Sequence, residues 1–78
     1  MYGITLEEIQ SIRKAQGGLC AICRKAPMNG KLYVDHNHTT GKVRGLLCLH
    51  CNLGLGHFND SLIGLSAAVR YLIAHATN

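Results

Sequence analysis

Four cysteines in two close pairs constrain the fold of this 78-residue chain more than any other feature. The first pair is Cys20-x2-Cys23, and a spacer of 24 residues separates it from the second pair, Cys48-x2-Cys51. Two such pairs match the spacing at which proteins bind a tetrahedral zinc ion. Ordering a chain this short costs on the order of 100 kcal/mol, which a small apolar core barely offsets, so a staple is expected. The sequence therefore predicts one small domain over residues 1–78, folded around a structural Zn²⁺.

Disulfide bonding is the alternative use of the same cysteines, which allow three pairings. Small disulfide-rich domains are typical of secreted proteins. Residues 1–8 contain neither the basic region nor the apolar region of a signal peptide. No apolar run reaches the roughly 18 residues that a membrane span requires. We therefore expect an intracellular protein whose cysteines bind zinc.

Basic residues are concentrated in the middle of the chain. Between Ile9 and Asn59 there are seven lysines and arginines and a single acid, Asp35. Clustered cations attract phosphates because binding releases condensed counterions, so the pattern favours a nucleic acid as a partner. A solvated basic surface is the simpler interpretation. The basic residues are Arg13, Lys14, Arg24, Lys25, Lys31, Lys42 and Arg44, of which Arg13, Lys42 and Arg44 are the candidate phosphate contacts.

The N-terminal part of the chain carries the signals of a helix from Leu6 to about Gln16. Thr5 is a candidate N-cap, and Glu8, three residues later, completes a capping box. Two glycines follow the expected last turn, and glycine is the residue that most readily ends a helix. The apolar residues of this segment recur at helical spacing on one face, which predicts an amphipathic helix.

Two short segments predict the strands of a β-hairpin. Residues 32–34 are rich in β-forming side chains, and residues 43–47 are expected to form the second strand. Residues 39–42, Thr-Thr-Gly-Lys, predict the turn, in a connecting loop expected to begin at Asp35. A short helix is expected to begin at the last cysteine or at the next residue, although two glycines within it each weaken it by roughly 1 kcal/mol.

A final helix is expected to begin near Asn59, Asp60 or Ser61, each of which can serve as its N-cap. Its residues are apolar almost all round, with Arg70 as the only strong charge. A helix of this kind is normally buried. Because so short a chain has little surface to cover it, the sequence predicts a homodimer formed through the C-terminal helix.

The segment Val34-Asp35-His36-Asn37-His38, together with Asn52, is the polar group best suited to chemistry. Asn52 directly follows a cysteine of the expected zinc site, and the hairpin joins Asp35 to the same site. A carboxylate and an amide oxygen on one rigid frame suit a hard divalent ion such as Mg²⁺. A neighbouring neutral histidine can accept a proton from an attacking water. These residues are therefore a candidate site for metal-dependent hydrolysis.

Five segments carry a resemblance to a known family. They are Tyr2-Gly3-Ile4-Thr5, Gln16-Gly17-Gly18-Leu19-Cys20-Ala21-Ile22-Cys23, Val34-Asp35-His36-Asn37-His38, Thr40-Gly41-Lys42-Val43-Arg44-Gly45-Leu46-Leu47-Cys48 and Cys51-Asn52-Leu53-Gly54-Leu55-Gly56. Together they resemble the phage recombination endonuclease VII family of HNH nucleases, from residue 2 to about residue 73. The resemblance implies a small α+β zinc-stapled domain with a ββα-metal (His-Me finger) core and flanking N- and C-terminal helices. It also implies a phage or prophage protein that acts in the host cell.

The resemblance also implies a function: a DNA endonuclease that hydrolyses phosphodiester bonds by nicking or double-strand cleavage. Asp35 and Asn52 would bind one catalytic Mg²⁺ or Mn²⁺ ion, which stabilises the charge of the transition state. His36 would be the general base, and His38 would position the phosphate or orient the loop. The zinc bound by Cys20, Cys23, Cys48 and Cys51 would be structural, with no open coordination position.

Two positions depart from the family pattern. Asn37 stands where the pattern Asp-His-Asp-His has its second acid, which removes one negative charge near the metal. Leu55 stands where junction-resolving members carry a further acid. These departures favour simple nicking or double-strand cleavage over the resolution of branched DNA.

The alternative function is a non-catalytic, zinc-ribbon-like module that binds nucleic acid or protein. Basic charge and four cysteines are expected equally of a nuclease and of such a binding module. A hydrolase that acts on RNA is a third reading. Asp35 as a turn cap and Asn52 as a helix cap are the structural interpretations of the two expected metal ligands. The remaining histidines, His50, His57 and His75, are interpreted as surface residues, the last of them near a helix end.

Overall fold

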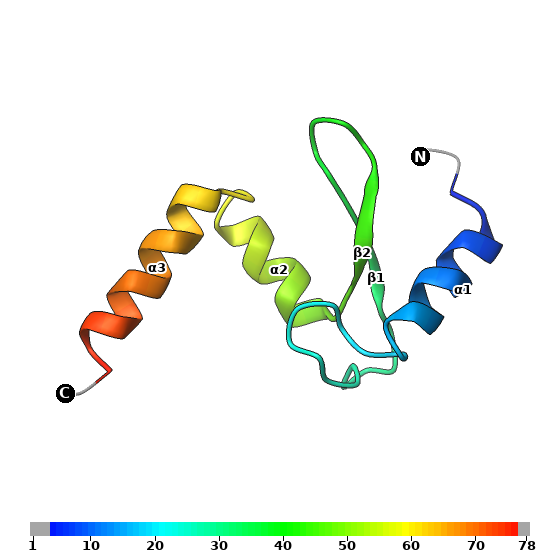
Figure 1. Cartoon of the computed structure of the whole chain (residues 1–78), viewed down its shortest axis with the longest axis horizontal. Helices are drawn as coiled ribbons and strands as arrows, with labels where there is room; N and C mark the ends of the chain where they lie inside the picture. Colours follow the sequence, from blue (N-terminus) through cyan, green and yellow to red (C-terminus); the bar gives the residue numbers. More distant parts are fainter. Residues whose placement is uncertain (1–3, 77–78) are drawn as a thin grey trace.

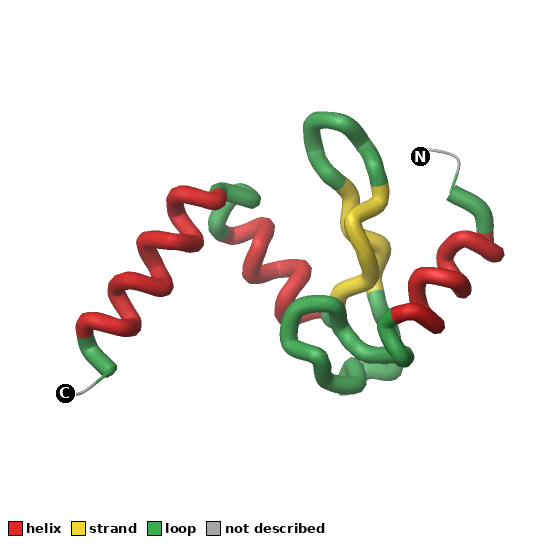
Figure 2. The backbone as a smooth tube through the Cα atoms, viewed as in Figure 1, coloured by secondary structure: helices red, strands yellow, loops and turns green. Residues whose placement is uncertain are grey.

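Residues 4–76, which this computed structural model describes, fold into three helices and a two-stranded antiparallel sheet (Figures 1 and 2). The elements in chain order are α1 (Leu6–Ala15), β1 (Tyr33–His36), β2 (Val43–Leu47), α2 (Leu49–His57) and α3 (Leu62–Ala74). The predicted small α+β architecture, with a helix before the hairpin and helices after it, is confirmed.

Helix α1 begins and ends where its sequence signals predict. The Thr5 hydroxyl accepts a hydrogen bond from the Glu8 N–H, and the Glu8 carboxylate accepts one from the Thr5 N–H, each at 3.1 Å. This is the predicted capping box. At the other end Gly17 adopts a φ of +67°, and it and the next glycine donate their N–H groups back into the last turn. A left-handed residue at this position satisfies carbonyls that the helix leaves open.

Gln16, the C-cap of α1, bonds to the backbone of β2 as a neighbouring strand would. Its Oε1 accepts from the Leu46 N–H at 3.0 Å, and its Nε2 donates to the Leu46 carbonyl at 3.0 Å. The same Nε2 donates to the Leu19 carbonyl at 2.8 Å. Gly45 permits this approach, because a Cβ there would lie 3.2 Å from Gln16 Oε1. One amide side chain therefore fixes the end of α1 to the sheet.

Replacing Gln16 with alanine is expected to lower the free energy of unfolding by about 2 kcal/mol, because it leaves the buried Leu46 N–H without a partner. Denaturant titration of the zinc-loaded protein measures this change. Gln10→Ala, at an exposed position of α1, is the matched control and should change the stability by less than about 0.5 kcal/mol. Equal stability of the two variants would show that the Gln16 amide contributes nothing.

The hairpin loop, residues 37–42, is closed by Asn37. Its Oδ1 accepts hydrogen bonds from the N–H groups of Thr39 and Thr40 at 2.8 and 2.9 Å. Its backbone N–H donates to the Lys42 carbonyl at 2.8 Å. Asn37, which stands where the pattern Asp-His-Asp-His has its second acid, therefore stabilises the conformation of this loop. The loop begins later than expected, since β1 continues through His36 and places Asp35 within a strand.

Helix α2 begins at Leu49, two residues before the earliest predicted start. Cys48 is its N-cap, and the Cys48 Sγ accepts a hydrogen bond from the Cys51 N–H at 3.5 Å. N-cap rules are built on oxygen-bearing side chains, so a cysteine in this role gives no such signal in the sequence. The helix is therefore tied at its first turn to the cysteine cluster.

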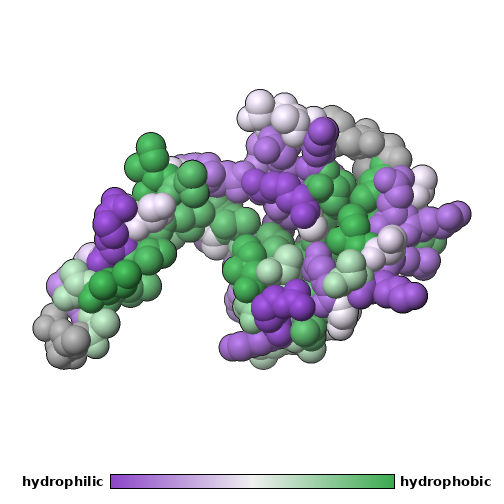
Figure 3. All heavy atoms as spheres, in the orientation of Figure 1, coloured by the Kyte–Doolittle hydropathy of each residue, from purple (hydrophilic) through white to green (hydrophobic). Residues whose placement is uncertain are grey.

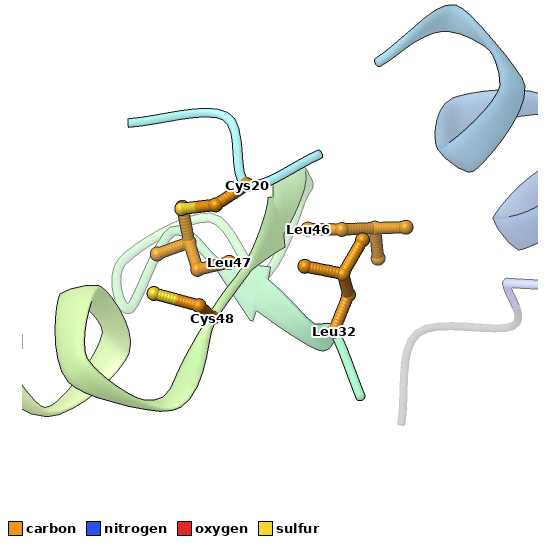
Figure 4. Packing of buried hydrophobic residues seen from close by; sticks show 5 residues of the cluster. All are labelled: Cys20, Leu32, Leu46, Leu47 and Cys48. Carbon is orange, nitrogen blue, oxygen red and sulfur yellow. The ribbon is translucent and has the colours of Figure 1, made fainter. Parts of the chain in front are cut away.

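The core is small and is centred on the hairpin. Leu46 and Leu32 lie side by side on the face of the sheet toward α1, while Leu47 lies with the sulfurs of Cys20 and Cys48 on the other face (Figure 4). This division follows from the alternation of side chains along a strand. Helix α1 contacts β2, and α2 contacts β1. Because cysteines are part of the core, the core and the expected zinc site form one unit.

Helix α3 projects away from the rest of the chain (Figure 1). Ser61 is its N-cap, one of the three predicted residues, and the Ser61 Oγ accepts from the Gly64 N–H at 2.9 Å. The radius of gyration is 14.4 Å, whereas a compact chain of this length would have about 11.5 Å. The rest of the chain therefore does not cover α3, and the homodimer through this helix stays a prediction.

The surface of α3 is apolar and exposed (Figure 3). No residue of the helix is buried. Six large apolar side chains are more than half exposed: Leu62, Ile63, Val69, Tyr71, Leu72 and Ile73. None of the helices within residues 4–76 combines the length and apolar character needed to cross a membrane.

Candidate functional site

The four cysteines meet where the loop that carries Cys20 and Cys23 lies next to the start of α2. Their Sγ atoms all lie within 4.8 Å of one another, and those of Cys23 and Cys48 are 3.9 Å apart. A tetrahedral zinc ion with Zn–S bonds of about 2.3 Å holds its sulfurs about 3.8 Å apart. All four cysteines are free thiols. The arrangement fits a structural Zn²⁺, as the spacing of the cysteines predicts.

The electrostatics of the cluster also favour a cation. Burial alone would raise the pKa of the Cys20 thiol. Hydrogen bonds from backbone N–H groups, among them that of Ile22, outweigh this effect and lower the pKa to about 6. Burial and the neighbouring thiols raise the pKa of Cys51 to about 12. One thiolate therefore opposes the ionisation of the next, and a bound divalent ion removes that repulsion.

Asp35 is the one buried charged residue among those that the structure describes, with 8 % of its surface exposed. Both of its carboxylate oxygens are bound by Arg44, at 2.6 Å from Nε to Oδ2 and 2.9 Å from Nη2 to Oδ1. The same guanidinium binds Asp60, at 2.8 Å from Nη1 to Oδ2 and 3.0 Å from Nη2 to Oδ1. Every guanidinium nitrogen of Arg44 therefore donates to a carboxylate. The prediction that Arg44 contacts phosphate stays a prediction.

A β-bulge directs Arg44 toward Asp35. In the ladder Asp35 pairs with Gly45 and His36 pairs with Val43, so Arg44 is the extra residue of β2. In a regular strand the neighbour of Gly45 would point to the opposite face from Asp35. A bulge changes this direction, and bulges often re-aim a side chain beside a functional site.

Asp60 is the site residue that the sequence identified only as a possible helix cap. It follows α2 in the joint to α3, where Asn59 and Asp60 adopt φ values of +54° and +59°. Asparagine and aspartate tolerate this left-handed region better than most residues. The hydrogen bonds that Arg44 donates lower the pKa of Asp60, and the same bonds to the carboxylates of Asp35 and Asp60 raise the pKa of Arg44. No local pattern links Asp60 to a residue that lies 16 positions earlier.

The two histidines of the candidate site have different surroundings. His36 is partly buried at the bulge, and its Nε2 atom is shielded from solvent. His38 is exposed and lines a cavity of about 290 Å³ with Gly56, Asn59 and Asp60. The loop of the hairpin therefore lies beside the joint between α2 and α3.

Asn52 lies in the first turn of α2 and is partly buried. Its backbone N–H donates to the Cys48 carbonyl at 3.0 Å, so the cysteine cluster fixes its position. Because α2 contacts β1, Asn52 and Asp35 belong to elements that face each other. Arg13 and Lys42, the other candidate phosphate contacts, are exposed and form no ion pair within residues 4–76.

Asp35 borders a cavity and keeps part of its hydrogen-bonding capacity. The cavity has a volume of about 270 Å³, and apart from Asp35 and Arg44 its lining is Gly45 and the apolar residues Ala21, Ile22, Leu47 and Leu55. A carboxylate accepts at roughly four positions, of which Arg44 takes two. Among residues 4–76 only the cysteines gather three or more Cys, His, Asp or Glu ligand atoms. An ion at Asp35 would therefore keep several waters, as Mg²⁺ usually does.

Comparison with known proteins shows the family to which the chain is similar and two phage relatives. A family described as recombination endonuclease VII matches residues 1–74. The chain is 52% identical over 75 residues to the Gene 59 protein of Mycobacterium phage D29, covering 91% of this chain and 44% of that protein. It is 49% identical over 76 residues to the Gene 59 protein of Mycobacterium phage L5, covering 92% and 45%. The chain thus spans less than half the length of these relatives. No solved structure matches it.

Proposed function

This chain belongs to the recombination endonuclease VII family, and we propose that it is an HNH nuclease domain that cuts phosphodiester bonds in DNA during phage infection. The observation that carries the proposal is the buried carboxylate of Asp35, next to His36 in a hairpin that leads directly into the cysteine-capped helix of Asn52. The consecutive elements β1, β2 and α2 would be the ββα-metal core.

In this mechanism His36 accepts the proton of the attacking water. The Nε2 atom of His36 is shielded from solvent, so Nδ1 would be the nitrogen that accepts this proton. The water oxygen attacks phosphorus, the bond to the 3′ oxygen breaks, and the leaving oxygen takes a proton from a solvent water, so the products carry a 5′ phosphate and a 3′ hydroxyl. Asp35 and Asn52 would hold one Mg²⁺ or Mn²⁺ ion, which supplies charge stabilisation to the phosphate and the leaving oxygen. His38, exposed at the loop, would position the phosphate.

The zinc site would have a structural role only. Four cysteine ligands fill a tetrahedral coordination sphere and leave no position for substrate. Its effect on the reaction is indirect, because Asn52 directly follows the ligand Cys51. Zinc would thereby fix the amide opposite Asp35. Arg13 and Lys42 are exposed cations that would contact the DNA backbone.

A plasmid assay tests the proposal. Zinc-loaded protein is incubated with supercoiled plasmid, with Mg²⁺, with Mn²⁺ or with neither. Conversion to nicked or linear DNA is expected only where one of the two ions is added. Binding of the plasmid without cleavage under all conditions would instead identify the alternative function, a non-catalytic zinc-ribbon-like module.

We also propose that α3 is the interface of a homodimer, because its exposed apolar side chains lie on a helix that contacts little else. Sedimentation velocity at micromolar concentration is expected to show a dimer. Val69→Lys with Leu72→Lys, one turn apart on one face, should give a monomer. Arg70→Gln is the control on the same helix and should leave the dimer intact. A monomeric parent protein would rule out the interface.

A further inference from the structure

We infer that Asp60 is a positioning residue for the proposed metal-dependent reaction, because it binds Arg44 and thereby keeps Asp35 able to attract a cation. The inference rests on the proposed function. It concerns a residue outside the hairpin and outside the first turn of α2, in the joint that precedes α3.

The charges of the three side chains provide the first argument. A guanidinium that binds both oxygens of one carboxylate forms a pair with no net charge, which offers little attraction to a cation. The pair of Arg44 with Asp35 alone would be such a group. Asp60 adds a second carboxylate, so one positive and two negative charges leave the network with a net charge of −1. Asp60 thereby restores the negative potential that Arg44 would cancel.

The geometry provides the second argument. Arg44 uses Nε for Asp35, Nη1 for Asp60, and Nη2 for both. When Asp35 turns its oxygens toward a metal ion, Arg44 can keep both hydrogen bonds to Asp60. Without Asp60 the released guanidinium would stand unpaired beside the incoming cation, which is a repulsive arrangement. Asp60 therefore lowers the free energy needed to exchange Arg44 for a metal ion.

The backbone provides the third argument. The Asp60 N–H donates to the Leu55 carbonyl at 2.8 Å, and Leu55 lines the cavity beside Asp35. Asn59 and Asp60 are both left-handed, a conformation that L residues rarely adopt in succession. The joint thus holds the Asp60 carboxylate at a fixed place relative to Arg44 through the last turn of α2.

Manganese binding tests the inference without reference to activity. The dissociation constant of Mn²⁺ is measured by electron paramagnetic resonance on zinc-loaded protein in the absence of DNA. Asp60→Asn keeps the shape and suits the same backbone angles, and it should weaken Mn²⁺ binding about tenfold. Glu7→Gln removes the same charge from an exposed position in the first turn of α1 and should change the constant by less than twofold.

A double-mutant cycle separates positioning from direct ligation. In an Arg44→Gln background, Asp60→Asn should weaken Mn²⁺ binding by less than about threefold, because Asp60 then has no guanidinium to neutralise and contributes only its charge at a distance. A tenfold effect that persists there would show a direct ligand and overturn the inference, as would unchanged binding in the single Asp60→Asn variant. A parent protein that binds Mn²⁺ but cuts no DNA would refute the proposed function while the Asp60 comparison still stands. A parent that binds no Mn²⁺ would refute both.

Discussion

Removal of zinc is expected to unfold this chain, with a loss on the order of 10 kcal/mol, which exceeds the stability of most small domains. Cys20 and Cys48 belong to the buried core, and Cys48 also caps α2. Chelation therefore removes the ion and leaves four unligated cysteines in the centre of the molecule, where one thiolate opposes the ionisation of the next. Far-ultraviolet circular dichroism should lose its helical signal with chelator and recover it when zinc is added back. A metal-free protein that keeps this signal and melts cooperatively would contradict the prediction.

Two cysteine variants separate zinc binding from other roles of the thiols. Cys20→Ser should abolish folding, since serine is a poor ligand for zinc at a fully buried position. Cys23→His is the matched control, because three cysteines and one histidine are a common structural zinc set and Cys23 is only partly buried. That variant should retain zinc, measured by metal analysis, and a folded spectrum.

His36→Ala is expected to reduce plasmid cleavage by about 10²- to 10⁴-fold, the contribution usual for a general base. The variant should keep its zinc and its circular dichroism spectrum, because His36 is not part of the buried apolar core. His57→Ala, at an exposed position of α2, should cut within about twofold of the parent and serves as the control. Cleavage by His36→Ala at the parental rate would remove the histidine from the mechanism.

The parts of the fold that the sequence predicted are those with local signals. The capping box at Thr5 and Glu8 involves neighbours in the chain, and the predicted bounds of β2, Val43 to Leu47, are confirmed. The cysteine cluster depends on spacing that a metal ion imposes. For the candidate site, the placement of Asp35 next to the cysteine-capped helix follows from the same spacing.

The parts that the sequence did not predict depend on long-range contacts. Gln16 binds a strand 30 residues away, and a glutamine at a helix end has many other uses. The bulge that makes Arg44 a partner of Asp35 depends on register, which a pattern of apolar residues does not specify at the single-residue level. Asp60 joins this network only because two left-handed residues turn the chain after α2.

The contact between Gln16 and β2 bears on the solubility of this protein. A two-stranded sheet exposes unpaired N–H and C=O groups along its outer sides, and such groups template pairing with strands of other molecules. At the centre of β2 the Leu46 N–H and carbonyl are already bound by Gln16, and the Ala21 N–H occupies the same carbonyl at 3.1 Å. The Leu46 N–H is therefore not free to bind an incoming strand. Gln16 at the end of α1 and Ala21 in the loop between Cys20 and Cys23 thereby protect this side of the hairpin from aggregation.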